Sequence, residues 1–161
     1  MRLPALPFRT LALALPAVFV LHVLEEAPDF VAWMNAHVEP DISDRTFLAV
    51  NVGAFLITLL VTALAVSARG RGTALVATAW VGFLMLANGV FHLTATIVDR
   101  AYAPGVVTSV LLYLPLCALL LRAVMKEFAL SPAAVVAVAL AGGMPMYIHG
   151  WRIVFEGGRL F

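Results

Sequence analysis

The sequence contains very little charge. Only 12% of its 161 residues are Asp, Glu, Lys or Arg, roughly half the share of an ordinary soluble domain, whereas 63% are hydrophobic and the mean hydropathy is +1.03. The net charge is +1 and the sequence has no cluster of Lys or Arg, which argues against a nucleic-acid partner. The composition predicts an integral membrane protein whose surroundings are the lipid bilayer.

Cysteine occurs once, at Cys117, so an intrachain disulfide is excluded. This residue lies within an apolar run, which predicts a buried and unreactive thiol. The sequence shows no long-period repeat and no low-complexity segment, and 161 residues leave little room for a second domain. We therefore predict one helical domain over residues 1–161.

Long apolar runs separate the few charged residues, and each run is near the ~20 residues that a helix needs to cross a hydrocarbon core of ~30 Å. The predicted segments are about Thr10–Leu24, Thr46–Ser67, Thr73–Val98, Val106–Val124 and Ala133–Trp151. The expected fold is an all-α integral membrane bundle of about five transmembrane helices. We predict a loop outside the membrane at Phe30–Asp44, and an interruption of the fifth segment at Gly142-Gly143-Met144-Pro145. The start of the chain is also typical of a secretory signal, but no small-x-small cleavage site precedes His22.

Five alternating crossings would place the two ends of the chain on opposite sides of the membrane. The side of the N-terminus would carry Arg2, Arg9, Arg69, Arg71, Arg122 and Lys126, and the other side would carry Arg45, Arg100, Arg152 and Arg159. Basic residues are enriched on the cytoplasmic side of membrane proteins. This distribution therefore favours an N-terminus in the cytoplasm.

The first apolar segment ends in the ionisable trio His22, Glu25 and Glu26, with no basic residue nearby to neutralise the carboxylates. At about 100° of rotation per residue, both glutamates lie within about 60° of His22, so the three side chains share one helix face. Ionisable side chains inside a membrane segment are costly and usually mark functional positions. The trio is therefore the first candidate site.

The buried polar residues of the other segments lie at a similar depth. A rise of ~1.5 Å per residue, counted from the cytoplasmic ends of the first, third and fifth segments, places His22, Asn88 and His149 roughly 18 to 25 Å across the membrane. The other residues on these segments lie slightly further across, and those on the second and fourth segments lie within about two turns of the outer end. The residues that share this outer half are His22, Glu25, Glu26, Asn51, Asn88, His92, Thr108 and His149. Scattered structural polar residues would not be expected to share a depth, so we predict one common site.

Three imidazoles and a carboxylate would hold a tetrahedral or five-coordinate metal ion, either zinc or iron, with one position open to water. The cation would also stabilise an ionised glutamate in apolar surroundings. The predicted ligands are His22, His92, His149 and Glu26, with Glu25 as the alternative carboxylate. The other glutamate is the predicted general base. Asn51 and Thr108 are predicted to support the bound ion, and Asn88 and Tyr147 to act in catalysis by hydrogen-bonding an oxyanion.

Each of these residues also has an ordinary structural interpretation. His22 alone is more often a satisfied interior histidine than a ligand, and the two glutamates could form a helix end that reaches the membrane interface. Asn88 and the Gly142-Gly143 pair are also typical of contacts between membrane helices. His149 could lie in the headgroup region. Their coincidence in depth favours a functional site.

The run His22-Val23-Leu24-Glu25-Glu26 matches the signature of the HXXEE family, a group of small bacterial multi-pass membrane proteins of unassigned function. Asn51 with Gly53, the run Asn88–His92 and Pro104-Gly105 also resemble that family's pattern, so the resemblance covers most of the chain. It implies a place in the bacterial inner (plasma) membrane and no particular activity.

A looser resemblance is to membrane hydrolases that include alkaline ceramidases and adiponectin receptors, which hold zinc with three histidines near one membrane face. The present chain has fewer helices and lacks their motif spacing. This likeness concerns site chemistry alone.

Three functions are consistent with these residues. The first is a metal-dependent hydrolase, in which an activated water attacks a carbonyl of a lipid or another apolar substrate. The second is a metal-independent isomerase or cyclase of an isoprenoid, with a protonated glutamate as the acid and a histidine as the base. The third is a proton- or cation-coupled transporter with an interrupted fifth helix. A transporter of only five helices would need a homo-oligomer.

Overall fold

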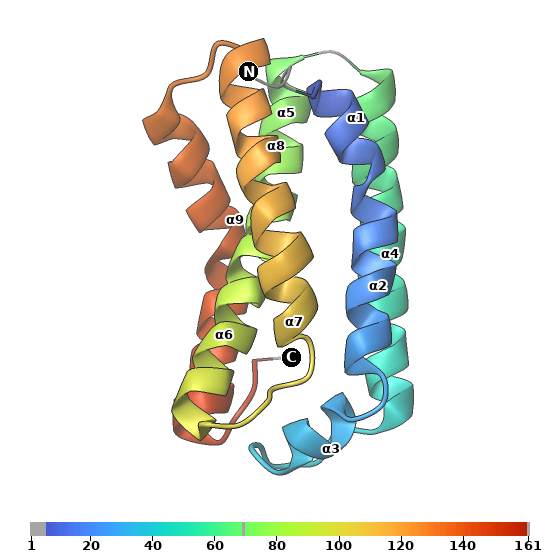
Figure 1. Ribbon diagram of the computed structural model, residues 1–161, viewed down its shortest axis with the longest axis vertical. Coiled ribbons are helices and arrows are strands. Elements are labelled where there is room, and N and C mark those ends of the chain that lie inside the picture. The colour runs from blue at the N-terminus through green and yellow to red at the C-terminus, as the bar shows by residue number, and fades with distance from the viewer. Residues whose placement is uncertain (1–5, 69, 161) are drawn as a thin grey trace.

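The computed structural model describes residues 6–68 and 70–160, and over these residues the regular structure is helical throughout. Five helical units are long and apolar enough to cross a membrane: Phe8–Glu26, Asp44–Ser67, Arg71–Asp99, Val106–Glu127 and Pro132–Glu156. Figure 1 shows them side by side in an elongated bundle. The predicted all-α bundle of about five such helices is confirmed.

Four of the five units are subdivided. The units comprise α1 (Phe8–Leu13) and α2 (Leu15–Glu26); α4 (Asp44–Ser67); α5 (Arg71–Val81), the π-helical stretch η1 (Gly82–Ala87) and α6 (Asn88–Asp99); α7 (Val106–Thr108), the π-helical stretch η2 (Ser109–Tyr113) and α8 (Leu114–Glu127); and α9 (Pro132–Trp151) with the π-helical stretch η3 (Arg152–Glu156). The segment predicted as a loop at Phe30–Asp44 is partly helical, because α3 (Phe30–Asn35) lies within it.

The helices form two groups that meet around the buried polar residues. In Figure 1, α1, α2 and α4 lie on one side, while α5, α6, α8 and α9 lie on the other. One cluster of buried apolar side chains fills the end of the bundle near α1. A smaller cluster lies near α3 and consists of Met34, Val38, Ala87, Phe91, Met146 and Ile153. His22 and Glu26 at the end of α2 are therefore enclosed by packed side chains, whereas Glu25 is partly exposed.

Pro16 explains the break between α1 and α2. Proline has no N–H, so it cannot donate to the carbonyl four residues earlier, which is that of Ala12. In the structure the hydroxyl of Thr62, on α4, donates to this carbonyl at 3.4 Å. The bend in the first unit is thus stabilised by the neighbouring helix.

The predicted interruption of the fifth helix does not occur, because α9 runs without a break from Pro132 through Pro145 to Trp151. Its glycines serve close packing instead. A Cβ atom on Gly142 would overlap the backbone of Ala79, and a Cβ atom on Gly82 would overlap the backbone of Ala139. Small residues allow membrane helices to approach this closely, and α9 packs along both α5 and η1.

This contact predicts a difference between two glycine substitutions. Gly142→Ala should lower the free energy of unfolding by about 1–3 kcal/mol, because the added methyl group must displace a neighbouring helix. Gly53→Ala is the matched control, since a Cβ atom there would meet nothing within 4 Å. It should leave stability unchanged or raise it by up to about 1 kcal/mol. Thermal unfolding of both variants in detergent measures the difference, and equal midpoints would contradict the packing described here.

Candidate metal centre

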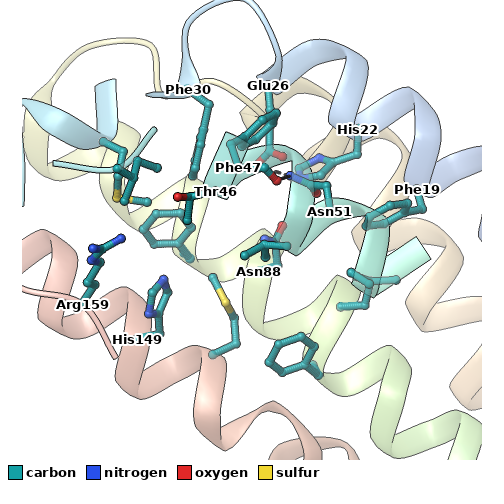
Figure 2. A pocket seen from close by; sticks show the side chains of 18 of the residues that line it. Phe19, His22, Glu26, Phe30, Thr46, Phe47, Asn51, Asn88, His149 and Arg159 are labelled. Atoms are coloured by element: carbon teal, nitrogen blue, oxygen red, sulfur yellow. Dashed lines mark hydrogen bonds and ion pairs between the residues drawn. The ribbon is translucent and has the colours of Figure 1, made fainter. Parts of the chain in front are cut away.

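Three predicted ligands come together at the end of α2. His22 and Glu26 lie one turn apart on α2, and His92 reaches them from α6. Oε1 of Glu26 is 3.4 Å from Nε2 of His22 (Figure 2) and 3.1 Å from Nε2 of His92. One ligand atom from each residue lies within 4.8 Å of the other two. The three residues are 2%, 5% and 0% exposed, so the cluster is shielded from solvent.

Of the four ring nitrogens in this cluster, only Nδ1 of His22 makes a hydrogen bond to another described residue. Within the described residues, Nε2 of His22 and both ring nitrogens of His92 are fully buried and make no hydrogen bond. The two Nε2 atoms lie close to the Glu26 carboxylate, but not in hydrogen-bonding geometry. Buried polar atoms without partners are rare and destabilising. A cation between the two imidazoles and the carboxylate would satisfy both Nε2 atoms and the carboxylate together.

Glu25 makes four hydrogen bonds outside this cluster. Its Oε1 accepts from the Tyr102 hydroxyl at 2.8 Å and from the Val107 N–H at 2.9 Å. Its Oε2 accepts from the N–H of Thr108 at 2.7 Å and from the hydroxyl of the same residue at 2.5 Å. Unpaired N–H groups at the start of a helix favour a carboxylate. Glu25 therefore ties the end of α2 to the start of α7.

Tyr102 keeps its proton in this arrangement. It lies in the connection between α6 and α7, outside the apolar helices. Partial burial raises the pKa of Tyr102 to about 12, and the hydrogen bond to the ionised Glu25 acts in the same direction. The hydroxyl thus remains a donor to Glu25 throughout the physiological pH range.

Thr108 connects Glu25 to His22 and determines which His22 nitrogen carries the proton. An ionised carboxylate only accepts, so the single hydroxyl proton of Thr108 is donated to Glu25. Oγ1 of Thr108 then accepts from Nδ1–H of His22, 2.8 Å away. In a neutral imidazole this leaves the lone pair on Nε2, which faces Glu26. Such a hydrogen bond orients a metal-binding histidine.

This connection predicts a specific effect of the Thr108 hydroxyl. Thr108→Val keeps the shape of the side chain but leaves Nδ1 of His22 without its acceptor. Zinc affinity should fall about 10- to 100-fold, the usual cost of removing a partner of a ligating histidine. Thr108→Ser retains the hydroxyl and should stay within a few-fold of wild type. Competition against a chromogenic chelator measures both affinities. If Thr108→Val and Thr108→Ser had the same zinc affinity, the Thr108 hydroxyl would not orient His22.

Gly105 lies directly against the two imidazoles. A Cβ atom there would be 2.6 Å from Cε1 of His92 and 2.9 Å from Cε1 of His22. Its φ of +98° also falls in the region that glycine adopts most readily. On another side of the cluster, the Tyr113 ring stacks on His22 with centroids 4.2 Å apart. These contacts restrict the positions that both histidine rings can adopt.

His22 and Glu26 form part of one wall of a cavity of about 130 Å³. Most of its lining is aliphatic or aromatic, and this volume is much larger than one ordered water needs. Asn51, predicted to support the ion, and Asn88, predicted to act in catalysis, both line it (Figure 2). The Asn51 amide donates to the carbonyl of Phe47 at 3.0 Å. Oδ1 of Asn88 is fully buried, and no hydrogen-bond partner for it occurs in residues 6–68 and 70–160.

Two predicted site residues on α9 lie apart from the cluster. His149 lines the same cavity on the opposite side from His22 (Figure 2), and its Nδ1 accepts from the N–H of Leu160 at 3.0 Å. Tyr147 lines a second cavity, beside Trp151. At about 100° per residue, positions 147 and 149 point in nearly opposite directions, so both cannot face one site. The structure does not bring His149 to the other three predicted ligands.

Sequence reasoning missed Gly105 and Tyr113 as parts of the site. Neither carries a local signal, because Pro104-Gly105 is typical of any turn and Tyr113 lies in an apolar run. The π-helical stretches give a structural signal instead: η1 immediately precedes Asn88, and η2 begins directly after Thr108 and ends at Tyr113. Short π-helical stretches occur frequently at functional sites.

The fold and the site define a class of protein: an apolar helical bundle with two histidines and a carboxylate buried beside an apolar cavity. A family model described as "Protein of unknown function with HXXEE motif" matches residues 13–120, well over half of the chain. The chain therefore belongs to the HXXEE family, as the resemblance indicated. No curated protein and no solved structure matches it.

The three polar residues of the HXXEE motif make two separate sets of contacts. His22 and Glu26 belong to the cluster, and Glu25 binds the start of α7 and the Thr108 hydroxyl. The second and third positions, Val23 and Leu24, carry no polar side chain. The motif is thus a helical i, i+4 pair with a neighbouring carboxylate that contacts the histidine through Thr108.

Proposed function

We propose that this protein is a metal-dependent membrane enzyme that hydrolyses a lipid or another apolar substrate. His22, Glu26 and His92 would hold one zinc or iron ion. The observation that carries the proposal is the set of unsatisfied, buried imidazole nitrogens around one carboxylate, on the wall of an apolar cavity. Three protein ligands with further positions open are the usual arrangement of catalytic zinc.

The roles of the surrounding residues follow from their contacts. A bound metal would lower the pKa of a water molecule and polarise a carbonyl, so that hydrolysis would need no strong base. Glu25 accepts four hydrogen bonds, and we therefore assign it a positioning role in place of the general-base role that its sequence position allowed. The Asn88 amide lines the cavity and is the group available to hydrogen-bond a substrate carbonyl.

The ligand count favours one second candidate, an oxidation at non-haem iron. Three histidines were expected, but the cluster contains two histidines and one carboxylate. This set is the facial triad of Fe(II) oxygenases, which leaves positions for oxygen and substrate. The identity of the metal would separate the two reactions. The transporter alternative loses the helix break that supported it, because α9 is continuous.

An experiment with lipid substrates tests this proposal. Purified protein is loaded with Zn²⁺, or with Fe²⁺ in air, and incubated with a bacterial polar lipid extract, and products are followed by liquid chromatography and mass spectrometry. Hydrolysis would split a lipid with the addition of one water. Oxygenation, with ascorbate added to the iron sample as a two-electron reductant, would insert one atom of O₂ into the lipid and release the other as water. Glu26→Gln should abolish product formation, and a chelator should do so reversibly. Turnover unaffected by both would refute a metal-dependent enzyme.

We further propose that the protein spans the bacterial inner membrane several times, with its N-terminus in the cytoplasm. The five apolar helices and the distribution of basic residues support this orientation. The centre would then lie in the outer half of the bilayer, in contact with lipid-derived substrates. Reporter fusions after residues 68 and 128 should both be active only with cytoplasmic reporters, and periplasmic activity at either position would contradict this topology.

A further inference from the structure

The C-terminal segment, residues 157–160, forms part of the cavity wall that lies opposite the cluster of His22, Glu26 and His92. After η3 the chain reverses at Gly157, whose φ is +65°. The Glu39 N–H donates to the carbonyl of Gly157 at 3.3 Å, and the Leu160 N–H donates to Nδ1 of His149 at 3.0 Å. These two bonds hold the segment against the bundle and place Arg159 on the cavity wall (Figure 2).

Arg159 has no anionic partner within the described chain. Over residues 6–68 and 70–160 its guanidinium makes no ion pair and no hydrogen bond, although the side chain is half-buried. By contrast, Arg152, on the same segment, pairs with Glu156 at 3.5 Å. The acidic residue among those that line the cavity is Glu26, which belongs to the metal cluster on the far wall. A partly buried cation without a partner is unfavourable, and an anionic ligand group would relieve this cost.

The cavity between Arg159 and the cluster is lined mostly by apolar side chains. Phe30, Met34, Phe47 and Met146 are among the side chains that line it. A small, fully charged molecule would gain little from these surfaces, whereas an alkyl or isoprenoid chain would bury apolar area against them. The cavity therefore combines a cation at one side, apolar walls, and the cluster at the other side.

We infer that the substrate is an amphiphile whose anionic group, a carboxylate or a phosphate, binds Arg159 while its apolar part lies along Phe47 and Met146 toward the His22 cluster. That the bound amphiphile is also converted rests on the proposed function, whereas its binding to Arg159 does not. His149 acts here as a positioning residue, because it holds the segment that carries Arg159. A free anion would satisfy Arg159 but would leave the apolar walls without a partner.

Photolabelling of the full-length protein tests this inference. The protein is placed in phosphatidylcholine nanodiscs and labelled with a diazirine-bearing fatty acid, or with the fatty alcohol of equal chain length. The acid should reach half-maximal labelling at a concentration about tenfold lower than the alcohol, as expected for one charge-assisted hydrogen-bonded contact. Peptide mass spectrometry should place the label on cavity residues such as Phe47 and Met146. Equal labelling by acid and alcohol would overturn the inference.

Variants separate the two walls of the cavity. In Arg159→Gln, the fatty acid should need the same concentration as the alcohol for half-maximal labelling. The control is Arg152→Gln, which changes a side chain that is 42% exposed, and this variant should still be labelled at a lower concentration by the acid. A His22→Ala/His92→Ala variant should also keep this preference, so failure of the metal proposal would leave this result intact. A preference lost in that variant but kept in Arg159→Gln would place the anion at the cluster and refute the inference. Competition by inorganic phosphate alone would show a free-anion site and refute the amphiphile.

Discussion

Glu26→Gln is expected to weaken zinc binding by more than about 100-fold, because it changes a proposed ligand. Removing a residue that only hydrogen-bonds a ligand typically costs about 10- to 100-fold in affinity. Glutamine preserves the size of the side chain but removes the negative charge that lies beside both Nε2 atoms. The adjacent change Glu25→Gln should cost only about tenfold, because Glu25 acts through Thr108. Chelator competition in detergent, with size-exclusion chromatography to check the fold, measures this difference.

The control for these variants is Glu156→Gln, a carboxylate that is 52% exposed and pairs only with Arg152 among the ion pairs of the described chain. It should bind zinc as the wild type does. If the Glu25 and Glu26 variants lost the same affinity, the two carboxylates would not have the separate roles assigned here. If neither variant lost affinity, the metal would bind elsewhere.

Gly105→Ala is expected to have the second large effect. The added methyl group would lie 2.6 Å from the His92 ring and 2.9 Å from the His22 ring, so the imidazoles or the turn must move. Zinc affinity should fall by roughly 10- to 100-fold, as for other changes that disturb ligand orientation. The unfavourable φ should also lower the free energy of unfolding by about 1–2 kcal/mol.

Gly157→Ala separates the effect of the positive φ from that of the contact with the imidazoles. Gly157 also has a positive φ, but among the described residues the atom near its added Cβ would be the His37 carbonyl oxygen, at 3.7 Å. This variant should lose stability in the same way while retaining zinc affinity. Thermal unfolding and chelator competition on the same preparations give both quantities. Wild-type affinity in Gly105→Ala would show that this glycine does not restrict the ligands.

The helices could be predicted well because their signal is local. A run of apolar residues near the thickness of a membrane is visible in the sequence, and the fourth unit begins at Val106 as expected. The fifth helix was the exception, since Pro145 normally weakens a helix. The packing of Gly142 and Gly82 against neighbouring backbone outweighs that local preference, and contacts between segments cannot be read from local sequence.

The site could be predicted only in part. Counting residues along each helix gives depth, and this was enough to place His22, Glu26 and His92 near one another. Depth does not give the rotation of a helix about its axis, which is why His149 shares the cavity but not the cluster. The bonds from Glu25 to Thr108 join residues 83 positions apart through a turn, and no periodic pattern indicates them.

Elemental analysis of the purified protein shows whether the cluster of His22, Glu26 and His92 binds a metal ion. The protein is prepared in detergent without chelators, beside the His22→Ala/His92→Ala variant, and both are measured by inductively coupled plasma mass spectrometry. We expect close to one zinc or iron ion per wild-type chain and almost none in a folded variant. Wild-type protein without stoichiometric metal would contradict it, and would leave acid-base catalysis on an isoprenoid as the hypothesis to test.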